Sequence, residues 1–510
     1  MDQANSDHVS LWVDSSPKTS FEPLSDDLEV DVAILGAGIV GITAASLLKK
    51  AGRSVAVVEM DKILHGTTGY TTGKITSGHS LKYHKLSSKH GGDVARGYAE
   101  ANEAALTHIS SVVSDEGIDC DLERRPNFVY CLAEDDVPAV QEEVKAATEA
   151  GLDASFVTET GLPFSVAGAV KLEDQAQFHP LKYLVHLAKQ IPGDGSFIFE
   201  STRATGVDED ETSVVSTDRG ALRARDVIVA TNYPFLDRGF FFPRVHPKRS
   251  YCIAGPIDPT RDPQGMYIST EPSYSVRTAP QGAETLLIVG GGGHNVGQEY
   301  DTEERYSELE RWAAERFGMT EVRYRWSSQD GATVDELPYI GTLRRGSEHV
   351  YVATGFGKWG MTNGTVAAML ISDLILKRTN PWSEVFDPHR LTVAASAQKF
   401  ATENLKVATH FLKDRVKHPQ EQAFEQLGNG EASVERVGLH QLAGYRDDEG
   451  ELHAVSAVCT HLGCIVAWNP AEKSWDCPCH GSRFDHQGKV LQGPAVKDLE
   501  PRELGDPTES

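Results

Sequence analysis

The chain of 510 residues has few basic residues, few cysteines and no long apolar run. Lysine and arginine number 49 against 74 aspartates and glutamates, so the formal net charge is −25. This excess of negative charge argues against nucleic acid and against anionic membrane surfaces as partners. The longest mainly apolar stretch, residues 34–48, contains several glycines and is too short to cross a bilayer. We therefore expect no integral membrane segment.

Export signals and a disulfide scaffold are also missing. The first eight residues, M-D-Q-A-N-S-D-H, contain no basic segment, no apolar segment and no twin-arginine pair. Of only seven cysteines, Cys120, Cys131 and Cys252 lie far from the other four, too few for a disulfide framework. These absences predict a cytoplasmic protein. The length allows two or three domains with sizeable cores.

The other four cysteines alternate with two histidines near the C-terminus. The sequence C-T-H-L-G-C spans 459–464, and C-P-C-H spans 477–480. Two thiolates and two imidazoles on paired loops suit a 2Fe–2S cluster in which one iron binds two Cys and the other two His. The alternative is a structural zinc site, which also uses Cys2His2 sets. A Cys2His2 zinc site would leave the two additional cysteines without a role as ligands.

With H-G-S-R-F at 480–484 and G-P-A at 493–495, this segment resembles the Rieske family. The resemblance implies a disulfide between Cys464 and Cys479. It also implies four cluster ligands, namely Cys459, His461, Cys477 and His480.

Two further positions of the Rieske resemblance bear on the cluster's reduction potential. Ser482 stands where the family places a hydroxyl that hydrogen-bonds a cluster sulfide, and Phe484 stands where high-potential members have Tyr. Because hydrogen bonds to cluster sulfurs raise the potential, Phe484 predicts a lower value.

A second strong pattern, at 31–59, reads as strand, glycine-rich turn, helix and strand. Gly36 permits the tight turn, Gly38 allows backbone to approach a pyrophosphate, and Gly41 allows the helix to pack on the strand. The helix N-terminus favours phosphates. Glu59, 23 positions after the first glycine, can bind ribose hydroxyls. Together these features predict a dinucleotide site.

Later segments indicate which dinucleotide. G-T-T-G-Y-T-T-G-K at 66–74 is either a flexible polar loop or a hydroxyl-rich loop over the pyrophosphate and ribityl chain of FAD. Further along, D-E-L-P-Y-I-G at 335–341 leads to a predicted strand at 350–354, to G-F-G-K-W-G-M-T at 355–362 and to a helix. The candidate FAD contacts of the first loop are Thr67, Thr72 and Lys74.

This series resembles the D-amino-acid oxidase superfamily of FAD oxidoreductases, of the glycine/sarcosine oxidase type, over about 30–390. The resemblance implies that the loop at 355–362 points its N–H groups at the N1–C2=O edge of the flavin, which is anionic when reduced. The FAD contacts implied in this loop are Gly355, Gly357, Gly360 and Thr362. It also implies a Rossmann-like α/β FAD-binding domain, an interleaved α+β substrate domain and then a small all-β Rieske domain.

The expected order is an N-terminal arm, the flavoprotein, a helical linker and the Rieske domain, at 1–30, 31–390, 391–419 and 420–510. Within the flavoprotein we assign FAD binding to about 31–95, 168–240 and 335–380. The substrate domain takes about 96–167 and 241–334.

No side chain is identified as the general base. The pocket candidates are Asp330, Lys358, Tyr251 and His79, and each has an alternative role in packing or as a solvated side chain. Arg249 shares a predicted strand with Tyr251. Glycine-oxidase-like members have an Arg between a Trp and an Asp with the spacing of Trp326 and Asp335, but here that position is Asp330. Since an Arg would bind a substrate carboxylate and an Asp would repel it, we expect a cationic or neutral substrate, unless Asp330 points elsewhere.

Two redox centres in one chain predict an FAD-dependent dehydrogenase or oxidase. It would oxidise a small molecule, such as an amine, and pass electrons singly from the flavin to the cluster and on to an external protein or quinone. In one alternative, electrons enter at the cluster and the flavin is the reducing or monooxygenase-like site. In another, the chain is a redox sensor or carrier without turnover. An enzyme needs a pocket at the flavin, whereas a carrier predicts an occluded flavin and an exposed histidine edge.

Overall fold

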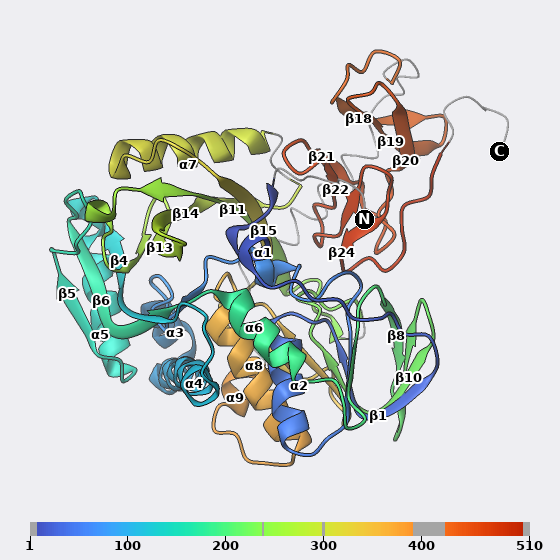
Figure 1. Ribbon diagram of the computed structural model, residues 1–510, viewed down its shortest axis with the longest axis horizontal. Helices are drawn as coiled ribbons and strands as arrows, with labels where there is room; N and C mark the ends of the chain where they lie inside the picture. The colour runs from blue at the N-terminus through green and yellow to red at the C-terminus, as the bar shows by residue number, and fades with distance from the viewer. Residues whose placement is uncertain (1–7, 237–238, 298–300, 391–423, 503–510) are drawn as a thin grey trace.

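The computed structural model describes residues 8–236, 239–297, 301–390 and 424–502. Figure 1 shows two sheets with helices packed against them and a smaller β domain, orange to red, at one side. The predicted linker at 391–419 lies outside the described residues. Within the described residues, no helix is long and apolar enough to span a membrane.

An eight-stranded sheet forms the nucleotide-binding part. Its strand β1 (Leu28–Leu35) pairs in parallel with β2 (Val55–Val58) and with β10 (Ala221–Val229). Successive residues of β1 enter two different hydrophobic clusters, so both faces of the strand are covered. The strand order is β16-β17-β10-β1-β2-β7, and β9 pairs with β10 while β8 pairs with β9. The remaining strands are β7 (Phe197–Phe199), β8 (Ala204–Asp208), β9 (Ser213–Thr217), β16 (Tyr339–Thr342) and β17 (Val350–Thr354).

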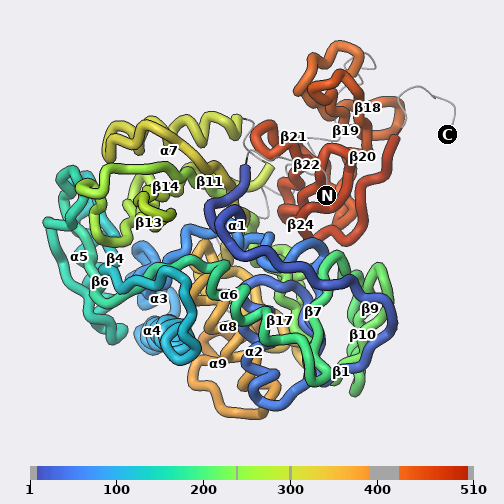
Figure 2. The backbone as a smooth tube through the Cα atoms, viewed as in Figure 1, coloured from blue at the N-terminus to red at the C-terminus, as the bar shows by residue number. Residues whose placement is uncertain are grey.

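Two apolar helices form one layer of this part. Helix α2 (Ile39–Lys50) packs against α8 (Gly360–Ile375), and most residues of both are buried, as expected for helices that are apolar around most of their circumference. Helix α6 (Pro180–Lys189) packs beside α2 (Figure 2). The packing fixes the N-termini of α2 and α8.

A nine-stranded sheet forms the substrate part, and its long antiparallel strands are β11 (Val245–Ile257), β14 (Glu284–Asn295) and β15 (Tyr324–Thr333). Strand β6 (Gly168–Gln177), assigned above to the FAD-binding part, belongs here because it pairs with β4. The other strands are β3 (Lys74–Ile75), β4 (Glu123–Cys131), β5 (Ala154–Val157), β12 (Met266–Ser269) and β13 (Ser275–Gln281). The remaining helices of the flavoprotein are α3 (Tyr83–His90), α4 (Gly92–Glu116), α5 (Val137–Glu149), α7 (Thr302–Phe317) and α9 (Ser383–Phe386).

The C-terminal domain, described over 424–502 and predicted to be a Rieske domain, is all-β as expected. It contains one three-stranded and one four-stranded antiparallel sheet, and its hydrophobic core surrounds the cysteines. The strands are β18 (Ala432–Val437), β19 (His440–Arg446), β20 (Leu452–Ser456), β21 (Ala467–Asn469), β22 (Ser474–Asp476), β23 (Arg483–Asp485) and β24 (Val490–Gln492).

The N-terminal arm contains a short helix, α1 (Leu11–Ser15), that packs on the loop at 66–74. Trp12 is 1% exposed, and its indole Nε1 donates to the carbonyl of Thr71 at 2.7 Å. The Arg277 guanidinium lies 5.2 Å from the centroid of the same ring. The arm therefore supports a loop that the sequence associates with FAD.

Replacing Trp12 should loosen this loop. Trp12→Ala removes a large buried ring, a change that costs about 3–5 kcal/mol in other cores. We expect a lower thermal midpoint and faster FAD release, measured by differential scanning fluorimetry and by flavin fluorescence. Lys18→Ala, an exposed position of the same arm, is the control. An unchanged midpoint and FAD release rate in Trp12→Ala would contradict the supporting role of the arm.

Candidate redox site

A cavity of about 750 Å³ extends from the glycine turn to the start of α8, and residues of the FAD-binding, substrate and Rieske parts all line it. This volume suits a bound organic cofactor. All four pocket candidates, Asp330, Lys358, Tyr251 and His79, line it. The predicted FAD contacts in its wall are Gly36, Gly38, Glu59, Thr67, Thr72, Lys74, Gly357, Gly360 and Thr362.

The glycine turn leaves no space for side chains. Gly36 has a φ of +102°, and a Cβ there would lie 2.6 Å from the carbonyl oxygen of Ala230. A Cβ on Gly41 would lie 1.9 Å from the carbonyl oxygen of Gly36. Since atoms cannot approach so closely, glycine is required at both positions. The turn therefore presents bare backbone to the cavity, as a dinucleotide site requires.

Two side chains hold backbone N–H groups at this turn. Thr68 Oγ1 accepts from the N–H of Ile39 at 3.0 Å, at the start of α2. The Glu59 carboxylate accepts from the N–H of Ala37 at 2.9 Å, and burial raises the pKa of Glu59. Helix α2 therefore begins at the cavity with its N-terminal geometry fixed, where it favours phosphate.

The loop before α8 has an unusual backbone. Gly355, Gly357 and Lys358 have φ values of +79°, +60° and +74°. Asp330 holds this loop, because its carboxylate accepts from the N–H of Lys358 at 2.6 Å and from the N–H of Gly331 at 2.8 Å. Among the described residues no side chain caps the start of α8, and Gly360 and Thr362 at this helix end form part of the cavity wall. A left-handed Lys is costly and is typical of functional loops.

Asp330 lines the cavity, but its carboxylate is held by backbone N–H groups, and the expected preference for a cationic or neutral substrate stays a prediction. Both of its oxygens already accept backbone N–H groups, and burial raises its pKa to about 6. Lys358 is exposed to the cavity rather than buried in the core, and desolvation there, together with the charge of Lys248, lowers its pKa. Because two lysines line this end of the cavity, Asp330 alone does not set its charge preference.

The remaining pocket candidates also have protein partners. His79 is buried, with Nδ1 2.7 Å from the hydroxyl of Tyr98, and its ring stacks on Trp359 at 4.4 Å. Burial lowers the pKa of His79 to about 3, which keeps the imidazole neutral. The Tyr251 hydroxyl lies 2.9 Å from Nε2 of His294. Lys74 donates to the carbonyl of Tyr267 at 2.6 Å, and burial lowers its pKa to about 7.

The Rieske cysteines divide into a disulfide and two thiols. Cys464 and Cys479 form the disulfide that the Rieske resemblance implied. Cys459 and Cys477 are free, and the hydrogen bond from Cys477 lowers the pKa of Cys459. A pair of free thiols of which one has a lowered pKa suits binding to iron.

The two histidines complete the donor set. The rings of His461 and His480 have centroids 5.0 Å apart. Nδ1 of His480 is buried and has no hydrogen-bond partner among the described residues. Burial lowers the pKa of His480 to about 3, so its ring is neutral, the form that binds metals. These donors fit a Rieske cluster.

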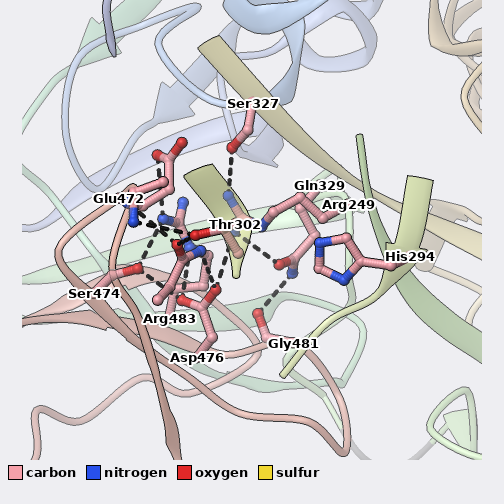
Figure 3. Close-up of polar contacts among 12 residues, drawn as sticks. Arg249, His294, Thr302, Ser327, Gln329, Glu472, Ser474, Asp476, Gly481 and Arg483 are labelled. Atoms are coloured by element: carbon pink, nitrogen blue, oxygen red, sulfur yellow. Dashed lines mark hydrogen bonds and ion pairs between the residues drawn. The ribbon is translucent and has the colours of Figure 1, made fainter. Parts of the chain in front are cut away.

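Of the two loops that carry the cluster donors, the second, at 477–480, lies against the flavoprotein. His480 is 5% exposed, and its ring lies 5.8 Å from the ring of Phe242. The next carbonyl, that of Gly481, accepts from Nε2 of Gln329 at 2.7 Å (Figure 3). The backbone carbonyl of Gln329 in turn accepts from Oγ1 of Thr67, in the cavity wall, at 2.9 Å. One residue therefore joins the cluster loop to the FAD loop.

Sequence reasoning missed the residues of this junction. Gln329 stands beside the conspicuous Asp330 but matches no motif. Arg249, on the same strand as the pocket candidate Tyr251, forms an ion pair with Asp476 of the Rieske domain. No spacing rule links residues that come together only when two domains pack. Thr68, between two glycines of the hydroxyl-rich loop, could have been named from its composition.

Both domains match known protein families. Residues 31–374 match the family described as FAD dependent oxidoreductase (DAO), and residues 420–502 match the Rieske [2Fe-2S] domain. YhfW of Bacillus subtilis (strain 168), whose name describes a Rieske 2Fe-2S iron–sulfur protein, is 38% identical over 497 residues, which are 97% of each chain.

Two other relatives each match one of the two domains. Gamma-glutamylputrescine oxidoreductase of Escherichia coli (strain K12) is 24% identical over 72% of this chain and 89% of its own. The cytochrome b6-f complex iron-sulfur subunit 1 of Nostoc sp. is 60% identical over 47 residues, 9% of this chain and 26% of that subunit.

Solved structures share the fold of the flavoprotein. Glycine oxidase from Geobacillus kaustophilus has a TM-score of 0.60 at 19% identity, covering 71% of this chain and 99% of that one. L-proline dehydrogenase from P. horikoshii has a TM-score of 0.59 at 19% identity, covering 72% and 98%. The chain belongs to the DAO family of FAD-dependent oxidoreductases and carries a C-terminal Rieske domain that binds a 2Fe–2S cluster.

Proposed function

We propose that the enzyme oxidises a small amine at the FAD and transfers the electrons one at a time, through the Rieske cluster, to an external one-electron acceptor. Oxidation of a C–N bond to C=N releases two electrons and two protons from the substrate. When bound, FAD supplies two-electron chemistry and the 2Fe–2S cluster supplies one-electron chemistry. The acceptor is a quinone or a redox protein, reduced in two successive steps.

The observation that carries this proposal is the burial of the second cluster loop against the FAD-binding part. His480, 5% exposed, faces the flavoprotein, and Gln329 bonds both to Gly481 and to Thr67. A free carrier would be expected to present this histidine to solvent. The cavity, in turn, supports turnover of a small molecule.

The residues around the cavity have separable tasks in this scheme. The loop at 355–358, held by Asp330, orients the N-terminus of α8 toward the flavin edge, where negative charge develops on reduction. Lys74 is buried with a pKa of about 7, so it can hold or release a proton near neutral pH. The His79 imidazole, kept neutral, fixes the stacking of Trp359 at the cavity wall.

The substrate class is proposed from the relatives. Gamma-glutamylputrescine oxidoreductase, glycine oxidase and L-proline dehydrogenase are all named for compounds that contain nitrogen. The wall at the flavin end presents Lys248 and Lys358 together with the satisfied carboxylate of Asp330. We therefore propose an amine without restricting its net charge.

The ligand assignment predicts a metal content. The purified protein should hold about one FAD and about two iron atoms per chain, with little zinc. Cys459→Ala should abolish the Rieske electron paramagnetic resonance signal and leave FAD bound, because the thiol reaches only the cluster. Cys131→Ala, a buried cysteine elsewhere, should retain both. Stoichiometric zinc without iron would overturn the assignment.

The surroundings of the cluster predict its potential. Ser482 and Phe484 are fully buried in the cluster domain, and a hydrogen bond from Ser482 helps lower the pKa of Cys459. Phe484→Tyr should raise the potential by adding a donor, and Ser482→Ala should lower it by removing one. Protein-film voltammetry measures both. If Phe484→Tyr causes no upward shift, the ring at 484 does not face a cluster ligand.

The proposed electron path predicts that the flavin is reduced before the cluster. Mixed anaerobically with a panel of amines, amino acids and hydroxy acids, the enzyme should show flavin bleaching with an amine and then the signal of the reduced cluster. Cys459→Ala should keep the bleaching but lose reduction of a quinone, because the flavin then lacks its one-electron outlet. Stopped-flow absorbance and freeze-quench resonance follow the two steps. Cluster reduction that precedes flavin reduction with an external donor would favour the reverse direction.

A further inference from the structure

We infer that Arg249, Gln329 and Asp476 are positioning residues that hold the Rieske domain in one docked orientation for electron transfer. This inference rests on the proposed function, because orientation matters only if electrons pass between the two centres. It is carried by buried polar contacts between the domains, by their close approach at two glycines and by a second set of contacts made by Arg203.

The turn between β21 and β22 inserts into the substrate part. Thr302, at the start of α7, donates from Oγ1 to Oδ1 of Asn469 at 2.9 Å and accepts from the N–H of Ala471 at 3.1 Å. Ala471 is 3% exposed and belongs to a hydrophobic cluster made of substrate-part residues. The turn between β21 and β22 thus anchors the Rieske domain in the hydrophobic core of the substrate part.

Charged side chains surround this anchor (Figure 3). Arg249 is 1% exposed, with Nη2 3.5 Å from the carboxylate of Asp476 and Nη1 donating to Ser327 Oγ at 2.5 Å. On the Rieske side, Arg483 donates to Asp476 at 3.1 Å and lies 3.6 Å from the carboxylate of Glu472. Two guanidinium groups and two carboxylates therefore balance in charge.

Such a network of buried charges fixes the relative orientation of two domains but adds little to the free energy of their association. Removing charges from water costs about as much as their attraction returns, so the net stabilisation is small. A rotated domain that still excluded water would leave the buried Arg249 guanidinium without its carboxylate partner, which is unfavourable, whereas Asp476 would keep Arg483. The network therefore selects one orientation, whereas apolar contact alone would tolerate sliding.

The two parts pack closely at the second cluster loop, where two glycines have no room for a side chain. A Cβ on Gly297 would lie 2.7 Å from Cβ of Pro478, in the second cluster loop. A Cβ on Gly481 would lie 2.4 Å from Nε2 of Gln329 and 2.6 Å from Cβ of Pro247. These glycines allow the cluster loop to lie directly on the flavoprotein, within reach of the Gln329 amide.

A second attachment lies near the glycine turn. Arg203 donates from Nη1 to the carbonyl of Val496 at 3.3 Å and lies 3.2 Å from the carboxylate of Asp498. Met60, directly after Glu59, packs against the hydrophobic core of the Rieske domain. Contacts at two separated places prevent rotation of the domain about either one.

The test compares docking with electron transfer in the holoenzyme. Arg249→Met keeps the volume and removes the charge, and Arg249→Lys restores the charge. Arg325→Met is the matched control, because Arg325 lies on β15 of the same part and pairs with Glu310 rather than with the Rieske domain. FAD is photoreduced with deazaflavin, and the cluster signal is followed in time. Hydrogen–deuterium exchange of residues 472–483 reports docking independently of activity.

We expect Arg249→Met to lose protection at 472–483 and to slow cluster reduction by about tenfold or more, since loss of one buried charged contact shifts a docking equilibrium by that order. Its cluster signal and potential and its FAD content should not change. Arg249→Lys should recover part of the rate, and Arg325→Met should match the unmodified enzyme.

The outcomes separate the two proposals. If the unmodified enzyme reduces its cluster and Arg249→Met does so at the same rate with unchanged exchange, the positioning inference is overturned. If the unmodified enzyme never transfers electrons from flavin to cluster, the proposed function fails, whatever the exchange data show. Should Arg249→Met not fold, Gln329→Met removes the donor to Gly481 and an acceptor of Arg249 while keeping the Arg249–Asp476 pair, and the same two measurements decide.

Discussion

The structure depends on one constraint, which is that the second cluster loop lies directly against the FAD-binding part. Gln329 meets this constraint with one side chain and one backbone carbonyl, which bond to Gly481 and Thr67. Cluster domain, substrate sheet and FAD loop are thereby joined at a single residue of β15. A flexibly tethered cluster would need none of these contacts.

The same constraint explains the shape of the cavity. Its wall combines the glycine turn, the loop held by Asp330 and residues contributed by the Rieske domain, among them Arg483 and Gly493. The N-terminal arm supports the remaining side, where Trp12 bonds to Thr71. The cofactor site is therefore completed by the first and last parts of the chain, although its phosphate-binding turn is built from 36–41 alone.

Backbone sterics shape the cofactor site, whereas buried charges fix the orientation of the two domains. Glycine at 36 and 41 is a steric requirement, since a side chain would collide with backbone atoms. The left-handed Lys358 is tolerated because Asp330 accepts its N–H. Between domains, Arg249 and Asp476 contribute orientation rather than net stability, because desolvation offsets their attraction.

The sequence by itself predicted a dinucleotide site and a Cys–His metal site, because the glycine turn and the Cys–His spacing act over a few adjacent residues, and the family resemblance then implied FAD, the 2Fe–2S cluster and both folds. The Cys464–Cys479 disulfide followed from resemblance in the same way. Tertiary structure alone decided that β6 joins the substrate sheet, that Asp330 serves the loop at 355–358, and that Arg249 faces the Rieske domain. These outcomes depend on which surfaces meet when distant segments pack, and neither periodicity nor motif spacing encodes such contacts.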